Sequence, residues 1–330
     1  PLALAAATAA LLAACGPEGI RDRLAPTTSP REGYERALAA AGLDRAAVGR
    51  DWVAAGAAAL DAPARAALPL REEGFLGAAE PTALAWAVRP RPGQRLTVRV
   101  TAEGDSGTRL FAELFAESGD STRAPRLVAA SDSLGAAFTV DADGDDAGYL
   151  LRLQPELLRA VRWSVRVEAG PSLAFPVEGK DSRAIQSFWG ADRDGGARAH
   201  QGIDIFARRG TPVLAAADGV AWTGDNALGG RVVFVRDPVR GHSLYYAHLD
   251  SQAVTSGAPV RTGDTVGFVG NTGNARSTAP HLHFGIYRSG RGAIDPLPFV
   301  DTRVARAAAV PAASLALAGR TGRTRAAGVT

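Results

Sequence analysis

The chain has 330 residues, of which 46% are hydrophobic and 22% are charged, so it is long enough to bury more than one core. A chain of this length favours two domains. There are 37 basic and 34 acidic residues, and the formal net charge is only +3. The two signs are interspersed, with no basic patch that is interleaved with aromatic residues. Composition therefore argues against nucleic acid as a partner.

Residues 1–15 form an apolar run, rich in alanine and leucine, that ends in Leu12-Ala-Ala-Cys15. The run is too short for a spanning helix, which needs about 20 residues, and it fits the apolar core of a secretory signal. Its end resembles a bacterial lipobox, and Cys15 is the only cysteine in the chain. We expect an exported lipoprotein, anchored in the membrane through lipid on Cys15, in a periplasmic setting. The alternative is a cleaved signal peptide with an unmodified cysteine.

Residues 16–30 contain glycine, proline, serine and threonine, and their composition predicts a tether. Residues 31–68 are predicted to form short helices, divided at Gly42-Leu-Asp44, with Asp44 as a cap. The apolar residues that carry the helical spacing are Tyr34, Leu38, Val48, Trp52, Val53 and Leu60.

Apolar residues alternate with polar ones from about residue 70, which is typical of strands rather than helices. Candidate strands are 83–88, 95–100, 109–115, 126–130, 137–140, 149–153 and 163–167, with turn-forming residues between them. The pattern predicts a β-sandwich accessory domain over residues 69–170.

Residues 171–300 contain short strands separated by turns and no convincing helix, so we expect an all-β, mostly antiparallel domain. Two strand pairs are predicted, one around Asp218-Gly219 and one around Gly263-Asp264. The loop 270–274 either lines a groove or is a long hairpin connection. After this domain, residues 301–330 contain five arginines and much alanine, and we expect a flexible tail.

The histidines are few and gathered in this second domain. The chain has only five, and four of them fall in three short patterns: His200-Gln-Gly-Ile-Asp204, Tyr246-Ala-His248 and His281-Leu-His283. The fifth, His242, is close by in sequence. Imidazole is the commonest protein ligand for zinc, and such clustering predicts a site.

Strand periodicity places these side chains. Side chains in a strand alternate between its faces, so His281 and His283 share one face and Leu282 the other. If residues 200–206 are extended, His200 and Asp204 also share a face. Two histidines and one carboxylate would bind Zn²⁺ and leave a fourth position open, as in catalytic sites. His248 and one histidine of the His-x-His pair then remain to move protons and steady an oxyanion.

In these motifs the chain resembles the LytM/lysostaphin-type zinc endopeptidases, the M23 peptidase family. The resemblance covers about residues 176–300. Besides the histidine motifs it includes the segments Gly210-Thr-Pro-Val and Ser277-Thr-Ala-Pro-His. It implies that His200, Asp204 and His283 bind Zn²⁺, and that His281 and His248 are catalytic, although it does not say which of them is the general base.

The resemblance also implies a substrate, the peptide stems of bacterial peptidoglycan, whose cross-links or bridges such enzymes cut. A D-Ala to diaminopimelate cross-link is the bond we expect, with glycine bridges as an alternative. Two other classes remain open: a non-catalytic module that binds the wall or activates an amidase, and a peptidase for glycine-rich protein substrates.

Overall fold

The computed structural model describes residues 28–120, 122–142, 146–306 and 322–325. Contacts within the chain divide it into two compact units, with a boundary between Gly170 and Pro171. The C-terminal unit is Pro171–Arg303, and the described residues outside that range form the N-terminal unit. The predicted signal segment 1–15, with Cys15, and residues 16–27 of the predicted tether lie outside the described residues. Within the described ranges, no helix is long and apolar enough to cross a membrane.

The N-terminal unit opens with helices, as predicted. They are α2 (Pro30–Ala40), the 3-10 turn η1 (Leu43–Arg45) and α3 (Ala47–Asp61). Helix α2 begins with a capping box, in which the Ser29 hydroxyl accepts from the Glu32 N–H and the Glu32 carboxylate accepts from the Ser29 N–H. The predicted cap at Asp44 is wrong. Asp44 lies within η1, and Ala46 is the N-cap residue of α3, without a side-chain hydrogen bond.

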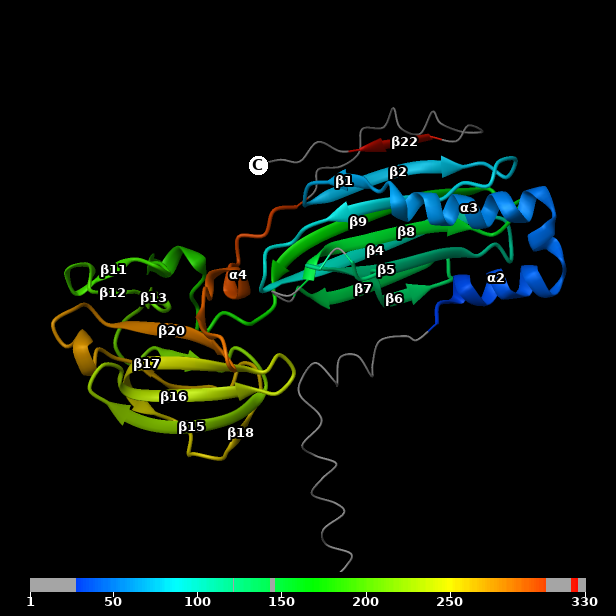
Figure 1. The fold of residues 1–330 in the computed structure, drawn as a ribbon. Helices are drawn as coiled ribbons and strands as arrows, with labels where there is room; N and C mark the ends of the chain where they lie inside the picture. The colour runs from blue at the N-terminus through cyan, green and yellow to red at the C-terminus, as the bar shows by residue number, and fades with distance from the viewer. Residues whose placement is uncertain (1–27, 121, 143–145, 307–321, 326–330) are drawn as a thin grey trace, which may run out of the picture. The chain divides into compact units, whose positions relative to one another are not determined.

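The rest of this unit is built from two five-stranded sheets (Figure 1). The first has the order β1 (Ala64–Ala66), β3 (Leu84–Val88), β8 (Asp146–Pro155), β5 (Leu110–Ser118) and β6 (Arg126–Ser131). The second has the order β22 (Gly322–Arg325), β2 (Leu70–Leu76), β9 (Val161–Pro171), β4 (Gln94–Gly104) and β7 (Gly135–Asp141).

The two sheets share one hydrophobic core, which makes them a sandwich. Trp86 of the first sheet and Trp163 of the second are both buried, and their ring centroids lie 5.4 Å apart in an edge-to-face arrangement. Strand β2 was not predicted from the alternation because Glu72 points inward. The Glu72 side chain is buried and its carboxylate accepts a hydrogen bond from Trp86 Nε1 at 2.9 Å, which offsets the cost of burying a carboxylate.

The helices belong to the same unit as the sandwich, since α3 packs on the first sheet. Trp52 and Phe111 are buried together with ring centroids 6.1 Å apart, and Trp52 Nε1 donates to the Pro155 carbonyl at 2.8 Å. Part of the predicted flexible tail is also strand in this unit, because residues 322–325 form β22 and pair with β2. Residues 307–321 and 326–330 lie outside the described ranges.

The C-terminal unit is a ten-stranded sheet with small additions, and its neighbouring strands are antiparallel. The main path has the order β10 (Ile185–Ser187), β13 (Ile203–Phe206), β20 (His281–Arg288), β17 (His242–Gln252), β16 (Gly230–Asp237), β15 (Gly219–Asn226) and β18 (Pro259–Val260). Off this path lie β14 (Pro212–Leu214), β19 (Thr265–Val269) and β21 (Gly292–Ile294), and a separate pair is β11 (Asp192–Arg193) with β12 (Arg198–Ala199). Short helical turns are η2 (Ser182–Ala184), η3 (Asp194–Gly196), η4 (Gly273–Ala275) and α4 (Leu297–Val300).

The two predicted strand pairs of this unit exist as strands but pair differently. Strand β14 pairs with β19, and β15 pairs with β18 and β16. The two strands that flank each of the turns at Asp218-Gly219 and Gly263-Asp264 therefore do not pair with each other as in a hairpin. Each of them pairs with a strand that flanks the other turn. The prediction was wrong because a tight turn is a local signal, whereas these partners are about fifty residues apart for β14 with β19 and about forty for β15 with β18.

One face of the main sheet is packed into the core, and the other face carries the histidines. Val233, Val235, Leu244 and Tyr246 are all buried on the core face. The four side chains alternate along β16 and β17, so their sequence neighbours face the opposite side. An antiparallel sheet that is covered on one side only leaves such a face free to build a site.

Candidate metal centre

Two adjacent strands and one loop bring the predicted ligands together. Asp204 on β13 and His283 on β20 are direct cross-strand partners, a position that holds their Cβ atoms about 5 Å apart. Ile203 and Leu282, next to them in sequence, point into the core and are fully buried. The hydrophobic pattern therefore fixes the strand register that sets these two polar side chains side by side. His200 reaches the same place from the loop between β12 and β13.

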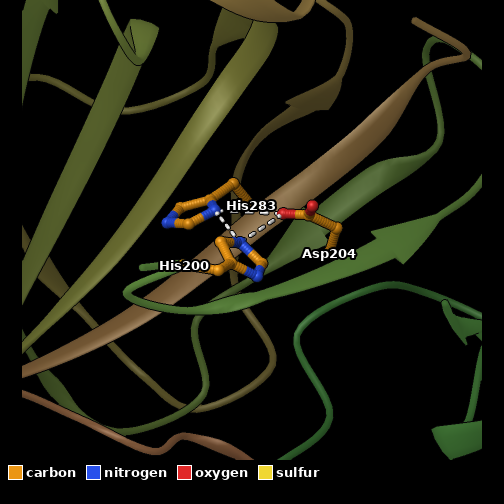
Figure 2. A group of neighbouring side chains, drawn as sticks. All are labelled: His200, Asp204 and His283. Carbon is orange, nitrogen blue, oxygen red and sulfur yellow. Dashed lines mark hydrogen bonds and ion pairs between the residues drawn. The ribbon is translucent and has the colours of Figure 1, made fainter. Parts of the chain in front are cut away.

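The ligand atoms of the three side chains converge, as Figure 2 shows. His200 Nε2 lies 3.1 Å from Asp204 Oδ1 and 3.0 Å from His283 Nδ1, and His283 Nδ1 lies 3.0 Å from Asp204 Oδ1. Ligand atoms about 2.0–2.1 Å from a tetrahedral zinc ion are about 3.3 Å apart. The donor set, its spacing and its burial therefore fit a divalent metal ion of this kind.

Gly202 leaves the space that His283 needs. A Cβ at position 202 would lie 2.7 Å from both Cε1 and Nε2 of His283 and 2.6 Å from the Phe284 carbonyl oxygen. Contacts this short do not occur between real side chains. The glycine between His200 and Asp204 is thus explained by the close approach of the imidazole, and the backbone there does not require a positive φ.

A second set of groups orients the ligands. His200 Nδ1 donates to the Phe188 carbonyl at 2.9 Å, which leaves Nε2 with its lone pair toward the centre. Arg193 donates to Asp204 Oδ2 at 2.6 Å and to the Ser187 hydroxyl at 2.7 Å. Arg193 occupies Oδ2, so Oδ1 is the carboxylate atom that faces the two histidines.

The electrostatics favour deprotonated ligands. Burial acts to raise the pKa of Asp204, but its interactions with the side chains of His200 and His283 outweigh burial and hold that pKa well below its usual range. Burial is also the main reason that the pKa of His283 is lowered. A carboxylate and neutral imidazoles are the forms that bind a metal.

His281 and His248 lie beside the ligands. His281 Nε2 is 4.0 Å from Asp204 Oδ1, and the ring centroids of His248 and His281 are 5.0 Å apart. His281 Nδ1 donates to the Ala279 carbonyl at 2.8 Å, and His248 Nδ1 donates to the Thr272 carbonyl at 2.9 Å. In the neutral form of either ring, Nε2 therefore carries the lone pair.

His248 has two unusual properties. Burial, together with the charges of His281 and His283, lowers its pKa to about 4. Its φ of 62° is left-handed, which among the described non-glycine residues is shared only with Leu158. The His248 N–H donates to the Gly229 carbonyl at 2.7 Å. Backbone strain of this kind is typical of functional sites.

The structure brings together all five of the predicted site residues in this domain, and it excludes the fifth histidine. His242 lies at the opposite end of β17, pairs with Arg288 and packs against Phe299 with ring centroids 5.5 Å apart. Cys15, the predicted lipidation site, is outside the described residues.

Sequence reasoning missed the side chains that support the site. Phe206 is the cross-strand partner of His281, and their rings stack at 5.0 Å with an interplanar angle of 26°. The hydrogen bond from Arg193 to Asp204 was not predicted either. The strand register would have found Phe206, whereas no local pattern connects Arg193 with Asp204.

The comparisons with known proteins agree with this arrangement. The model of peptidase family M23 matches residues 198–296. An L-Ala–D-Glu endopeptidase of Bacillus subtilis is 36% identical over 137 residues, which is 38% of this chain and 42% of the relative. The peptidoglycan DD-endopeptidase ShyC of Vibrio cholerae is 30% identical over 189 residues, 55% of this chain and 39% of the relative. The chain thus spans less than half the length of these two relatives.

Among solved structures, the catalytic domain of lysostaphin from Staphylococcus simulans is 33% identical, with a TM-score of 0.32. The similarity covers 35% of this chain and 90% of that domain. Every histidine of the centre, and Asp204, falls within the matched residues. Residues 198–296 of this chain therefore belong to peptidase family M23.

Proposed function

We propose that the C-terminal unit is a zinc-dependent endopeptidase that cuts peptide cross-links in bacterial peptidoglycan. The observation that carries the proposal is the convergence of His200 Nε2, Asp204 Oδ1 and His283 Nδ1, each about 3 Å from the other two. Two further imidazoles lie next to them. A structural metal site would close the fourth position with another protein ligand, whereas the converging group among the described residues has three members, His200, Asp204 and His283.

A zinc ion held by these ligands would act as a Lewis acid and would lower the pKa of a coordinated water to about 7. The chain's own groups supply the remaining chemistry. His281 and His248 each present a lone pair at Nε2, so one can accept a proton from the attacking water and return it to the leaving amine. The other can donate to the developing oxyanion once it is protonated. Arg193 holds Asp204 in place during both steps.

The names of the relatives support the substrate. The Bacillus relative is named for an L-Ala–D-Glu bond and the Vibrio relative for a D,D bond of peptidoglycan. Of the two names, the Vibrio one states peptidoglycan as the substrate. We propose the cross-link as the bond that this chain cuts, and the complete ligand set argues against a module that binds or activates without cutting.

The proposal includes the location of the enzyme. Lipid on Cys15 would hold the chain at the membrane, with its units facing the wall on the periplasmic side. Fractionation of cells that express the wild type or Cys15→Ser tests this directly. We expect the wild type in the membrane fraction and the variant in the soluble fraction, and equal distribution would contradict the anchor.

The test of activity compares digests of purified peptidoglycan by the wild type, by His283→Ala and by Asp204→Ala, with bound metal measured in each. His242→Asn serves as the control, because His242 is a histidine of the same unit outside the centre. We expect one zinc per wild-type chain, cross-linked dimers cut to monomers, and loss of both zinc and cutting only in the two ligand variants. A ligand variant that stays fully active would contradict the proposal. So would a zinc-loaded wild-type protein that leaves the cross-linked dimers uncut.

A further inference from the structure

A row of aromatic side chains runs across the sheet on the face of the metal centre. Trp222 on β15 pairs with Phe234 on β16, and Phe234 pairs with Tyr245 on β17. Gly285 on β20 continues this row, two residues from His283. Direct partners share a face, as do residues two apart in a strand, so the row and His283 lie on one face. The four strands lie side by side in Figure 1.

The inner rings of this aromatic row contact one another and the centre, and Trp222 extends the row as the cross-strand partner of Phe234. The centroids of Phe234 and Tyr245 are 4.7 Å apart, and Tyr245 lies 5.9 Å from His283 and 6.0 Å from Tyr287. At Gly285 the Gln201 carbonyl oxygen and the Tyr287 ring lie close to the sheet, 3.2 and 3.4 Å from where a Cβ would stand. The aromatic row therefore consists of Trp222, Phe234 and Tyr245, and its inner end contacts the ring of the metal ligand His283.

The outer end of the row is exposed to solvent. Trp222 is 52% exposed, and Val220, on the same face of β15, is 38% exposed. Two large apolar side chains are thus exposed next to each other on one face of β15, at the outer end of the row, where a ligand can reach them.

We propose that the aromatic row is a subsite for the glycan strand of peptidoglycan, a role that rests on the function proposed above. Sugar rings present C–H groups on one face, which pack on aromatic rings, and polar groups at their edges. The row offers both kinds of contact. The Tyr245 side chain is hydrogen-bonded to Asn226, and Val220 is flanked in the next row by Arg236 and Ser243 across the strands.

The distance from the centre to Trp222 selects the bond that would be cut. Trp222 is three strands away from His283 across the sheet and two residues away along the strand direction. With the usual strand spacing and rise per residue, the two positions are about 16 Å apart. An extended peptide spans this distance with about four or five residues. The stem peptide is attached to the sugar by its first residue. If the cross-link is the bond at the metal centre, the stem peptide therefore reaches from the centre to a sugar over Trp222. If the bond next to the sugar were cut, the sugar would lie near the centre instead.

The first experiment compares two substrates, a cross-linked muropeptide dimer with its disaccharides and the same dimer stripped of sugars. We expect a KM about tenfold lower for the sugar-bearing dimer. Trp222→Ala should raise that KM to the value for the sugar-free dimer, with kcat and the sugar-free KM unchanged. Trp222→Phe should keep most of the preference. Val239→Ala is the control, because Val239 is 59% exposed and lies in the turn between β16 and β17, away from the row.

A second experiment does not depend on catalysis. Chitotetraose, a peptide-free N-acetylglucosamine oligomer, is titrated into the full chain while the indole N–H signals are followed by NMR. The Trp222 signal is assigned by its absence in Trp222→Ala. We expect it to shift and saturate at millimolar sugar, with the signals of the buried Trp52, Trp86 and Trp163 unchanged.

The outcomes separate the subsite from the proposed function. If neither dimer is cut, the endopeptidase function fails, while a saturating shift of Trp222 would still support the subsite. Equal KM values for the two substrate dimers in the wild type would overturn the subsite. So would an equal rise of both KM values in Trp222→Ala, which would assign the row to peptide binding. The subsite would also be overturned if the Trp222 indole signal did not move with chitotetraose, or if sedimentation showed that the protein itself dimerises and that Trp222→Ala abolishes this dimerisation.

Discussion

Gly202→Ala tests whether close packing around His283 sets the metal site. The new Cβ would lie 2.7 Å from two atoms of the His283 ring and 2.6 Å from the Phe284 carbonyl oxygen. Ordinary contact begins near 3.4 Å, so the backbone at residue 202 must move away from β20 by about 0.8 Å, and the His283 ring by about 0.7 Å if that backbone stays in place. Either movement changes the distances between His200, Asp204 and His283. Catalytic groups must be held to within about 0.5 Å, and a displacement of 1 Å costs about a hundredfold in rate.

We therefore expect Gly202→Ala to lose between tenfold and a hundredfold in kcat/KM and to bind zinc at least tenfold more weakly. Overpacking should also lower the free energy of unfolding by about 1–3 kcal/mol. Zinc affinity is measured by competition with a chelator, and unfolding by denaturant titration of the metal-free chain. Gly224→Ala is the matched control in the same sheet, since its Cβ would meet only Val232 Cγ2 at 3.5 Å. Wild-type affinity and turnover in Gly202→Ala would refute the steric reasoning.

Three further predictions follow from the contacts. His248→Ala should keep its zinc and lose most of its turnover, and loss of zinc on dialysis would show instead that His248 is a ligand. Phe206→Ala removes the ring stacked on His281; we expect kcat to fall about tenfold with zinc content unchanged, whereas an unchanged kcat would show that the stack does not position His281. Trp52→Ala should lower the free energy of unfolding of the N-terminal unit by about 3–5 kcal/mol, because Trp52 is 1% exposed. Its turnover per zinc-loaded chain should equal that of the wild type, and a loss there would show that the N-terminal unit takes part in catalysis.

Strand positions were predictable because burial on one face forces alternation. Seven predicted strands of the sandwich correspond to β3 to β9 of the structure. Strand β2 was missed since Glu72, a residue that normally marks a surface, is buried against Trp86. Pairing was less predictable than position, as the crosswise partners of β14 and β15 show.

The ligands were predictable because their spacing is local. The His-x-His pair shares one face by strand periodicity, and His200 with Asp204 falls within five residues. The supporting groups depend on the folded chain. The contact of Arg193 with Asp204 crosses from the small β11–β12 pair to the main sheet. The aromatic row needs the register of four strands, which no single segment of sequence specifies.

The most direct test of the account is the position of the metal in a crystal of the zinc-loaded chain, located by anomalous scattering at the zinc edge. We predict one strong peak about 2.0–2.2 Å from His200 Nε2, Asp204 Oδ1 and His283 Nδ1, with no bond to His248 or His281. A peak bound to either of these histidines in place of a predicted ligand, or no peak in a preparation that cuts peptidoglycan, would contradict it.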